Sequence, residues 1–156
     1  MTRPRALLAL LLSAALVDAS APAPPLAPGA VRVNSTDALV QNVGDASVER
    51  ILVAAGHYLL SSTISVNRTL TIEAEGGGGE VRIDGQRQTR LLHVSAPANL
   101  TLLGLTLVNG YTNDGTGGGV ALVEGGALRL SRCIVANSTA QVRAIHTSLP
   151  GLMPSS

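Results

Sequence analysis

Two stretches of the chain repeat one pattern: LLHVSAPANLTLLGLTLVNG at residues 91–110 and GVALVEGGALRLSRCIVANS at residues 119–138. The two copies superpose when residue 91 is placed on residue 119. In this alignment Leu100 falls on Leu128, and the other apolar positions coincide as well. The aligned pairs also include Leu92 with Val120, Val94 with Leu122, Leu102 with Leu130, Leu105 with Cys133, Leu107 with Val135, and Asn109 with Asn137.

A third copy of the pattern stands earlier in the chain, where residues 70–72, LTI, match residues 100–102, LTL. The period is therefore roughly 30 residues, and a coil of three short strands and three turns needs about 20 to 30 residues. One coil cannot bury its inward side chains alone, but stacked coils place each inward Leu or Val on its counterpart. The period therefore predicts a parallel β-helix.

Short apolar runs between Gly, Asn and Ser turns favour strands almost throughout the chain. One stretch differs, TDALVQNV at Thr36–Val43, which predicts a short helix that Thr36 could cap and that could cover the apolar end of a strand stack. The expected strands are Arg50–Ala54, Tyr58–Leu60, Ile64–Val66, Leu70–Ala74, Glu80–Ile83, Leu91–Val94, Leu100–Leu102, Leu105–Val108, Val120–Val123, Leu128–Leu130 and Cys133–Ala136.

Residues 51–72, 76–86, 98–110 and 117–140 together resemble the pectin-lyase-like right-handed β-helix family. The resemblance is closest to polymorphic outer-membrane-protein-type repeats. Gly118-Gly119-Val120 and Gly125-Gly126-Ala127-Leu128 approximate their Gly-Gly-Ala-Ile-like motif, and Ile134-Val135-Ala136-Asn137 approximates their apolar–x–x–Asn motif, with Ile134 where Phe is usual.

The resemblance implies an all-β fold: a right-handed parallel β-helix (solenoid) of about three to four coils with a short N-terminal capping helix. It covers roughly residues 31–140. Members of the family usually have many more coils. As a guide to function the resemblance is poor, because this fold hosts lyases, hydrolases, adhesins and surface scaffolds.

Residues 1–19 have the layout of a secretory signal peptide. Arg3 and Arg5 form a basic start, and residues 6–17, ALLALLLSAALV, form an apolar run. That run is shorter than the ~20 apolar residues that span a bilayer. Val17-Asp18-Ala19 fits a cleavage site, with Ser20 as the new N-terminus. The sequence predicts a secreted or cell-surface protein with no membrane span after cleavage; an uncleaved anchor is the competing interpretation.

The remaining chain divides into three parts. Residues 20–30, SAPAPPLAPGA, are predicted to form an extended Pro/Ala-rich linker. Residues 31–140 form the predicted β-helix domain, an incomplete solenoid. Residues 141–156, QVRAIHTSLPGLMPSS, contain two prolines and no inward periodicity, which predicts a disordered tail. The last coil would then expose its edge and its apolar face, which favours self-association.

The composition excludes several functions. The chain is 46% hydrophobic and 13% charged, too apolar for a disordered protein. Eleven basic and ten acidic residues give a net charge of +1, and removing Arg3, Arg5 and Asp18 with the signal leaves nine of each, a net charge of 0. A neutral chain without basic clusters argues against binding to nucleic acid or to an acidic membrane.

Four sequons mark Asn34, Asn67, Asn99 and Asn137 as glycosylation candidates. Asn109 and Asn137 occupy equivalent repeat positions, so their side chains are also expected to form a structural ladder at a bend. Ordinary turn chemistry is the alternative for both residues, and a buried ladder Asn137 could not carry a glycan. The single cysteine, Cys133, is expected to be buried as a small apolar residue, or else free to pair with another molecule.

No group of residues in the sequence predicts catalysis, a cofactor or a metal site. Glu73 and Glu75 face one way on a predicted strand and could form a weak cation site with Asp84. The favoured interpretation is that the two glutamates lie at a solvated strand end and that Asp84-Gly85 forms a tight turn. The three histidines lack ligand spacing and are expected in turns or on the surface: His57, His93 and His146. The glycine runs at residues 76–79 and 117–119 lack the Gly-Lys-Ser/Thr of a phosphate loop and are expected to form turns.

These observations favour a secreted, non-enzymatic β-helix module, adhesin-like or a surface scaffold, whose polar faces contact extracellular polysaccharide or cell-surface components weakly. Two alternatives stay open. One is a polysaccharide lyase or glycoside hydrolase of the pectin-lyase-like fold, and the other is a truncated, non-functional fragment of a longer β-helix protein.

Overall fold

The computed structural model describes residues 24–76 and 80–140. This part is mostly β, with one helix. In chain order the elements are β1 (Ala30–Val33), α2 (Thr36–Gly44), β2 (Arg50–Val53), β3 (Gly56–Leu59), β4 (Ile64–Val66), β5 (Leu70–Ala74), β6 (Val81–Asp84), β7 (Leu92–Ser95), β8 (Asn99–Leu103), β9 (Leu105–Val108), β10 (Tyr111–Thr112), β11 (Ala121–Glu124), β12 (Ala127–Ser131), β13 (Ile134–Ala136) and β14 (Thr139–Ala140).

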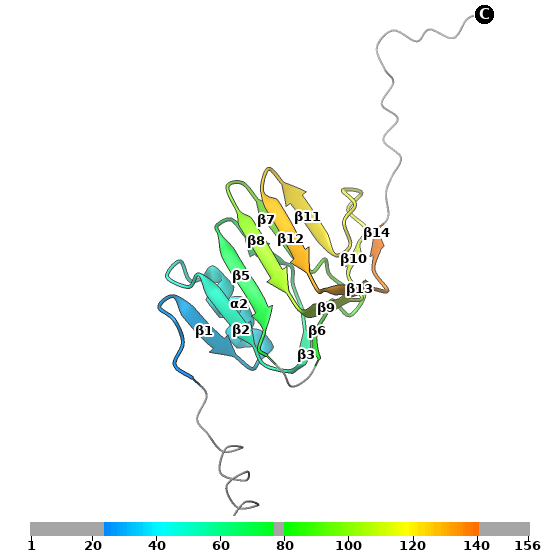
Figure 1. Ribbon diagram of the computed structural model, residues 1–156. Helices are drawn as coiled ribbons and strands as arrows, with labels where there is room; N and C mark the ends of the chain where they lie inside the picture. Colours follow the sequence, from blue (N-terminus) through cyan, green and yellow to red (C-terminus); the bar gives the residue numbers. More distant parts are fainter. Residues whose placement is uncertain (1–23, 77–79, 141–156) are drawn as a thin grey trace, which may run out of the picture.

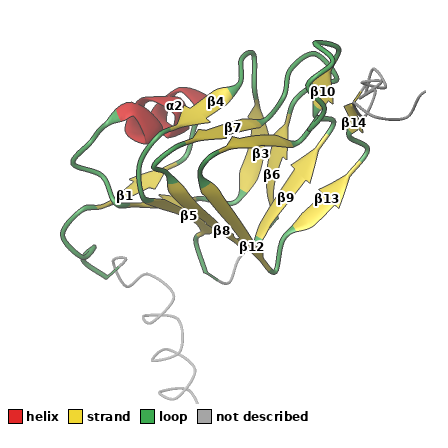
Figure 2. Cartoon of the chain, turned by 90° about the horizontal axis from the view of Figure 1, so that it is seen from above, coloured by secondary structure: helices red, strands yellow, loops and turns green. Residues whose placement is uncertain are grey.

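The strands form three separate sheets, and every pairing within them is parallel. Five strands lie in the order β1-β2-β5-β8-β12, four in the order β13-β9-β6-β3, and three in the order β11-β7-β4. A further parallel pair joins β10 to β14. Figure 1 shows the five-stranded sheet in the foreground, and Figure 2, seen from above, shows the sheets enclosing a common interior.

Aliphatic side chains fill that interior because each strand alternates inward and outward residues. Leu70 pairs with Leu100, and Leu100 pairs with Leu128, so one row of leucines crosses three strands as the sequence predicted. Leu70 and Leu100 are fully buried. A core of Leu, Val and Ile needs such in-register rows, since the described chain contains no Phe or Trp to fill larger spaces.

The predicted fold class, a right-handed parallel β-helix of about three to four coils with a capping helix, is wrong. The strands belong to three separate all-parallel sheets that hold five, four and three strands, and one helix accompanies them. A solenoid prediction needs a constant repeat, but the sequence separation of paired residues changes within the five-stranded sheet. Its partners include Ala30 with Arg50, Arg50 with Thr71, Leu70 with Leu100 and Leu100 with Leu128.

The alignment of residue 91 on residue 119 also fails in the three-stranded sheet. It placed Leu92 on Val120 and Val94 on Leu122, whereas the structure pairs Leu92 with Ala121 and Val94 with Val123, one position further along the chain. A slip of one residue exchanges the two faces of a strand. The paired strand β11 therefore turns Val123, rather than Leu122, toward the side on which Val94 is buried.

The helix predicted at Thr36–Val43 is present as α2, Thr36–Gly44. Its N-cap is Ser35 rather than Thr36: the Ser35 side chain accepts a hydrogen bond from the Ala38 amide at 3.2 Å. Leu39 and Val43 are buried in the core, while Val40 is 42% exposed. Contacts with β1, β2 and β4 place α2 over the N-terminal end of the sheets.

The opposite end of the sheets has no such cover among the described residues. Val123, Leu130 and Val135 are 42%, 47% and 48% exposed. Their pairing partners one strand inward are buried: Val94, Leu102 and Leu107. We call the edge formed by β11, β12 and β13 the open end.

Several predicted segments lie outside the described residues: the signal peptide at residues 1–19, the start of the linker at residues 20–23, the tail at residues 141–156 with His146, and glycines 77–79. The rest of the linker is described. Pro24–Gly29 leads directly into β1, a strand that the sequence patterns did not predict.

The leucine row provides the first test of this core. Leu100→Ala removes a fully buried side chain between two paired leucines and is expected to lower the free energy of unfolding by about 2 to 5 kcal/mol. Urea denaturation measures the change. The matched control is Leu59→Ala on β3, where the leucine is 47% exposed and the expected loss is below about 1 kcal/mol. Equal losses in the two variants would contradict the core described above.

Candidate functional site

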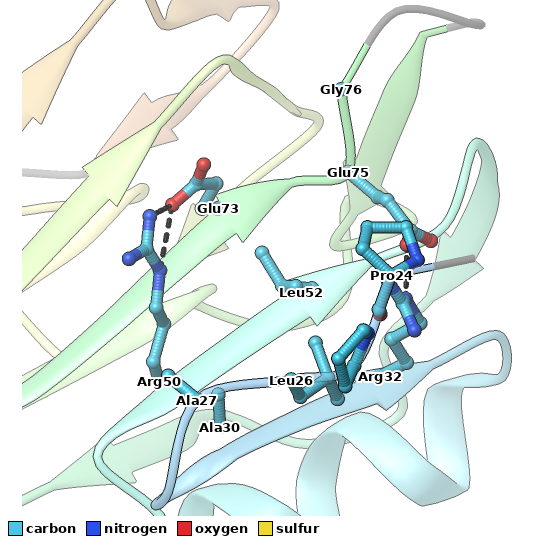
Figure 3. Close-up of a pocket in the computed structure, with 11 residues that line it drawn as sticks. Pro24, Leu26, Ala27, Ala30, Arg32, Arg50, Leu52, Glu73, Glu75 and Gly76 are labelled. Atoms are coloured by element: carbon cyan, nitrogen blue, oxygen red, sulfur yellow. Dashed lines mark hydrogen bonds and ion pairs between the residues drawn. The ribbon is translucent and has the colours of Figure 1, made fainter.

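A groove of about 470 Å³ runs along β1, β2 and β5 (Figure 3). Strand alternation turns Arg32, Arg50, Leu52 and Glu73 outward, while Ile51, Val53 and Ile72 between them are buried. The segment Pro24–Ala27 forms one wall. The groove thus has an apolar centre on Leu52 and polar flanks.

Two ion pairs cross the groove on the surface of the sheet. Arg50 donates through Nε and Nη2 to a carboxylate oxygen of Glu73, with Nε at 2.9 Å. Arg32 donates through Nε to Glu75 and through Nη2 to the carbonyl oxygen of Pro24 at 3.2 Å. Arg32 therefore fixes the proline wall against the sheet, and Figure 3 shows Leu52 between the two pairs.

Glu73 and Glu75 do line one groove, but the structure does not bring Asp84 to them. Among the described residues no group of three or more His, Cys, Asp or Glu side chains could hold a metal ion. Each glutamate bonds to an arginine, whereas a glycoside hydrolase needs a proton-donating acid beside a free carboxylate. The groove can therefore donate and accept hydrogen bonds, but it lacks the arrangement needed for acid–base cleavage.

A second hollow, of about 350 Å³, lies on the same outward side, over β5, β8 and β12. Thr71, Asn99, Thr101 and Arg129 line it. Thr71 pairs with Thr101, and Thr101 pairs with Arg129, so these side chains stand in one row across neighbouring strands. Hydroxyl, amide and guanidinium groups on one surface provide both donors and acceptors.

His57 and Asp84 form a pair on the four-stranded sheet. His57 Nε2 lies 2.9 Å from Asp84 Oδ2, and the other carboxylate oxygen accepts from the Gln86 amide at 2.7 Å and from Asn109 Nδ2 at 2.9 Å. Burial alone would raise the pKa of Asp84, but hydrogen bonds from Asn109, Gln86 and His57 together hold it below its usual range. No hydroxyl or thiol bonds to His57 among the described side chains, so the pair has no nucleophile.

This geometry bears on the predicted ladder of Asn109 and Asn137. Both residues adopt left-handed backbone conformations, with φ of 54° and 53°, at equivalent bends after β9 and β13. The bond seen for the Asn109 amide is to Asp84, and Asn137 is exposed. A ladder bond between the two asparagines therefore stays a prediction, while the bend itself is described.

The glycine-rich segment 112–118 is held by Arg90, a residue that the sequence patterns did not single out. Its guanidinium donates to the Thr116 hydroxyl at 2.6 Å, to the Gly117 carbonyl at 2.8 Å and to the Gly118 carbonyl at 2.9 Å. It also reaches Asp114 at 3.2 Å. A Cβ atom added at Gly118 would stand 2.2 Å from a backbone oxygen. The backbone thus packs too closely at Gly118 for a side chain, and the segment forms a turn as the sequence predicted.

The remaining candidates lie apart from the groove. The four sequon asparagines, Asn34, Asn67, Asn99 and Asn137, are all exposed, and Asn99 stands beside the second hollow. Cys133 is half-buried, with Sγ 3.4 Å from the Leu102 carbonyl oxygen. His93 lies 2.6 Å from Glu124 at the surface.

The fold and the grooves together define a mostly β protein with two polar-lined hollows on the outward side of its five-stranded sheet. No family model, no curated protein and no solved structure matches the chain. These comparisons therefore identify no pectin-lyase-like family, and that resemblance stays a prediction. No helix in the described ranges is long and apolar enough to cross a membrane.

The Asp84 cluster provides a test of the bend after β9. Asn109→Gly keeps the positive φ but removes the amide donor, so the pKa of Asp84 rises toward its usual value. A carboxyl with a lowered folded-state pKa stabilises the fold above the unfolded value of about 3.9, and that stability is lost as pH falls through the folded value. Acid unfolding of the variant should begin at a higher pH than in the parent chain.

Circular dichroism between about pH 2 and pH 5 measures this shift. Asn137→Gly is the matched control, because it makes the same change at an equivalent bend where the side chain is exposed. Its acid unfolding should stay unchanged. A parallel shift in both variants would mean that the backbone, rather than the bond to Asp84, is responsible.

Proposed function

We propose that the protein is a secreted, non-enzymatic surface module that binds polysaccharide weakly along the outward side of its five-stranded sheet. We call this side the outer face and define it by two rows of residues. One row is Arg50, Thr71, Thr101 and Arg129, and the other is Arg32, Leu52, Glu73, Leu103 and Ser131.

The first row is the single observation that carries the proposal. Its four side chains stand in register on β2, β5, β8 and β12, and adjacent strands are about 4.8 Å apart. Hydrogen-bonding groups therefore repeat at a constant spacing across the strands. A polymer with regularly repeated hydroxyl groups is the kind of ligand that matches such a row, since successive units can bond to the arginine and threonine side chains of successive strands.

The chemistry of the outer face also accounts for weak binding. None of the residues in the two rows is aromatic, so a sugar ring gains no stacking contact on them. Arg32 and Arg50 are already paired with Glu75 and Glu73, which limits the charge available to attract an acidic polymer. Binding would then depend on several neutral hydrogen bonds, each worth about 0.5 to 1.5 kcal/mol.

Secretion is proposed from the signal-like residues 1–19 and from the four exposed sequon asparagines. The absence of enzymatic activity is proposed because Glu73 and Glu75 are paired with arginines and His57 has no nucleophile among the described residues. Asn99 borders the outer face, so a glycan attached there would cover part of it.

Affinity electrophoresis tests the binding, with protein from a host that does not add N-glycans and gels that contain a neutral glucan or a polyuronate. We expect at least one polymer to retard the protein. The double variant Thr71→Val, Thr101→Val removes two hydroxyls and keeps two β-branched side chains, so the dissociation constant should rise about 5- to 100-fold. Ser65→Ala, an exposed hydroxyl on β4, is the control and should bind like the parent chain.

Absence of retardation in every gel would contradict the proposal, as would equal retardation of the parent chain and the double variant. A second assay addresses the enzymatic alternative. Incubation with polyuronate and calcium should release no shortened or unsaturated products. Cleavage that copurifies with the protein would show that a lyase or hydrolase is the correct interpretation.

A further inference from the structure

We propose that residues 112–118 form a cation-binding loop whose cation is supplied by the chain itself, with Nη2 of Arg90 at the position that a calcium ion would take. We call these residues the oxygen loop. None of them belongs to the outer face, so the inference does not depend on polysaccharide binding. The oxygen loop connects β10 to β11, and β10 pairs with β14 (Figure 1).

Five oxygen atoms converge on one nitrogen of the Arg90 side chain. Nη2 lies 2.6 Å from the Thr116 hydroxyl and 2.8 Å from the Gly117 carbonyl oxygen. The Thr112 hydroxyl lies at 3.2 Å, and the two carboxylate oxygens of Asp114 lie at 3.3 and 3.2 Å. Nη2 carries two hydrogens, which cannot be aligned with five acceptors at once. The oxygen loop therefore surrounds a point of positive charge, as the ligands of a metal ion do.

The backbone of the oxygen loop turns its oxygens toward this point. Gly115, Gly117 and Gly118 adopt φ of 78°, 73° and 68°, a region that glycine reaches without steric cost. The carbonyl of Gly117 accepts from Nη2, and the carbonyl of Gly118 accepts from Nε. The Thr116 hydroxyl donates its proton to Asp114 Oδ1 at 2.6 Å, so its oxygen presents lone pairs to the cation.

The ligand set is the kind that calcium prefers. It consists of one carboxylate, two hydroxyls and backbone carbonyls, and calcium binds about 6 to 8 such oxygens at about 2.3 to 2.6 Å. A calcium ion would draw the five oxygens inward and keep water as its remaining ligands. Magnesium fits less well, because it needs octahedral geometry at about 2.0 to 2.1 Å and gives up its water reluctantly.

Arg90 already fills this position in the protein. Its side chain is 10% exposed, and a guanidinium stays protonated at every pH at which the chain is folded. Hydrogen bonds from Thr116 and Thr112 keep the pKa of Asp114 well below its usual range, so the carboxylate that balances this charge stays ionised. The oxygen loop should therefore keep its conformation without any metal, and the parent chain should bind no calcium there.

Removal of the internal cation tests the proposal. Arg90→Ser leaves the oxygens of the loop facing one another, so the variant should melt at a lower temperature than the parent chain. Millimolar calcium should raise that melting temperature, and magnesium at the same concentration should not. Because the loop supplies one carboxylate, we expect a dissociation constant of about 10⁻⁴ to 10⁻³ M, measured by titration calorimetry. Calcium should leave the parent chain unchanged.

Two further variants separate this site from a general effect of charge. Arg87→Ser is the matched control, because Arg87 is an exposed arginine three residues before Arg90 and outside the loop. Its melting temperature should equal that of the parent with and without calcium. Asp114→Asn, added to Arg90→Ser, removes the carboxylate and should raise the calcium dissociation constant at least about tenfold.

If Arg90→Ser does not fold in buffer, refolding from urea with and without calcium replaces the melting comparison, and recovery is expected with calcium alone. An unchanged melting temperature of Arg90→Ser without metal would overturn the proposal, because the loop would then need no cation. Absence of calcium binding to that variant, equal effects of calcium and magnesium, or failure to refold in either condition would overturn it as well.

Discussion

The rest of the structure depends on rows of aliphatic side chains held in register between parallel strands. Neighbouring strands lie about 4.8 Å apart, so a leucine such as Leu100 packs directly against the leucines on either side of it. With Tyr58 as the single aromatic ring in the described core, any slip between strands would leave a void and turn inward residues to solvent. This requirement fixes which side chains point outward and therefore which of them line the two grooves.

At two bends between strands, the chain turns through a backbone conformation that few residue types adopt. Asn109 and Asn137 both turn the chain in the left-handed region, where asparagine is tolerated better than most residues. Arg90 performs a different task by bonding to successive groups of the segment 112–118, which replaces the hydrogen bonds that strand pairing would give. The core and the bends are therefore stabilised by separate kinds of interaction.

The repeated apolar pattern and one local change of periodicity explain which parts of the fold could be predicted from the sequence. The pairing of Leu70 with Leu100 and of Leu100 with Leu128 followed from the spacing of identical residue types, and α2 followed from one short change of periodicity. The fold class did not follow, because the bends differ in length: Ala30 pairs with Arg50, a much nearer partner in sequence than Leu100 is to Leu70. A single repeat length cannot represent strands whose connections vary.

The groove was inaccessible to sequence reasoning for a related reason. Arg32 meets Glu75 across 43 residues, and Arg50 meets Glu73 across 23, so neither pair has a local signature. The strand β1 was also missed, since AVRV follows directly on a proline-rich segment that favours extended chain without specifying a partner. Such features become visible only when the sheet order is known.

The connections between strands differ in length while the strands keep their pairing register, and this has a consequence for engineering. The five-stranded sheet keeps its register across connections of unequal length, so sequence added at an exposed bend is expected to lengthen the connection and leave the register intact. The bend at Ser61 and Ser62 is exposed, whereas Leu60 and Ile64 on either side anchor it in the core. A foreign peptide grafted there would be displayed on a rigid support, and lengthening a flexible graft twofold would cost only about 0.6 kcal/mol of closure entropy.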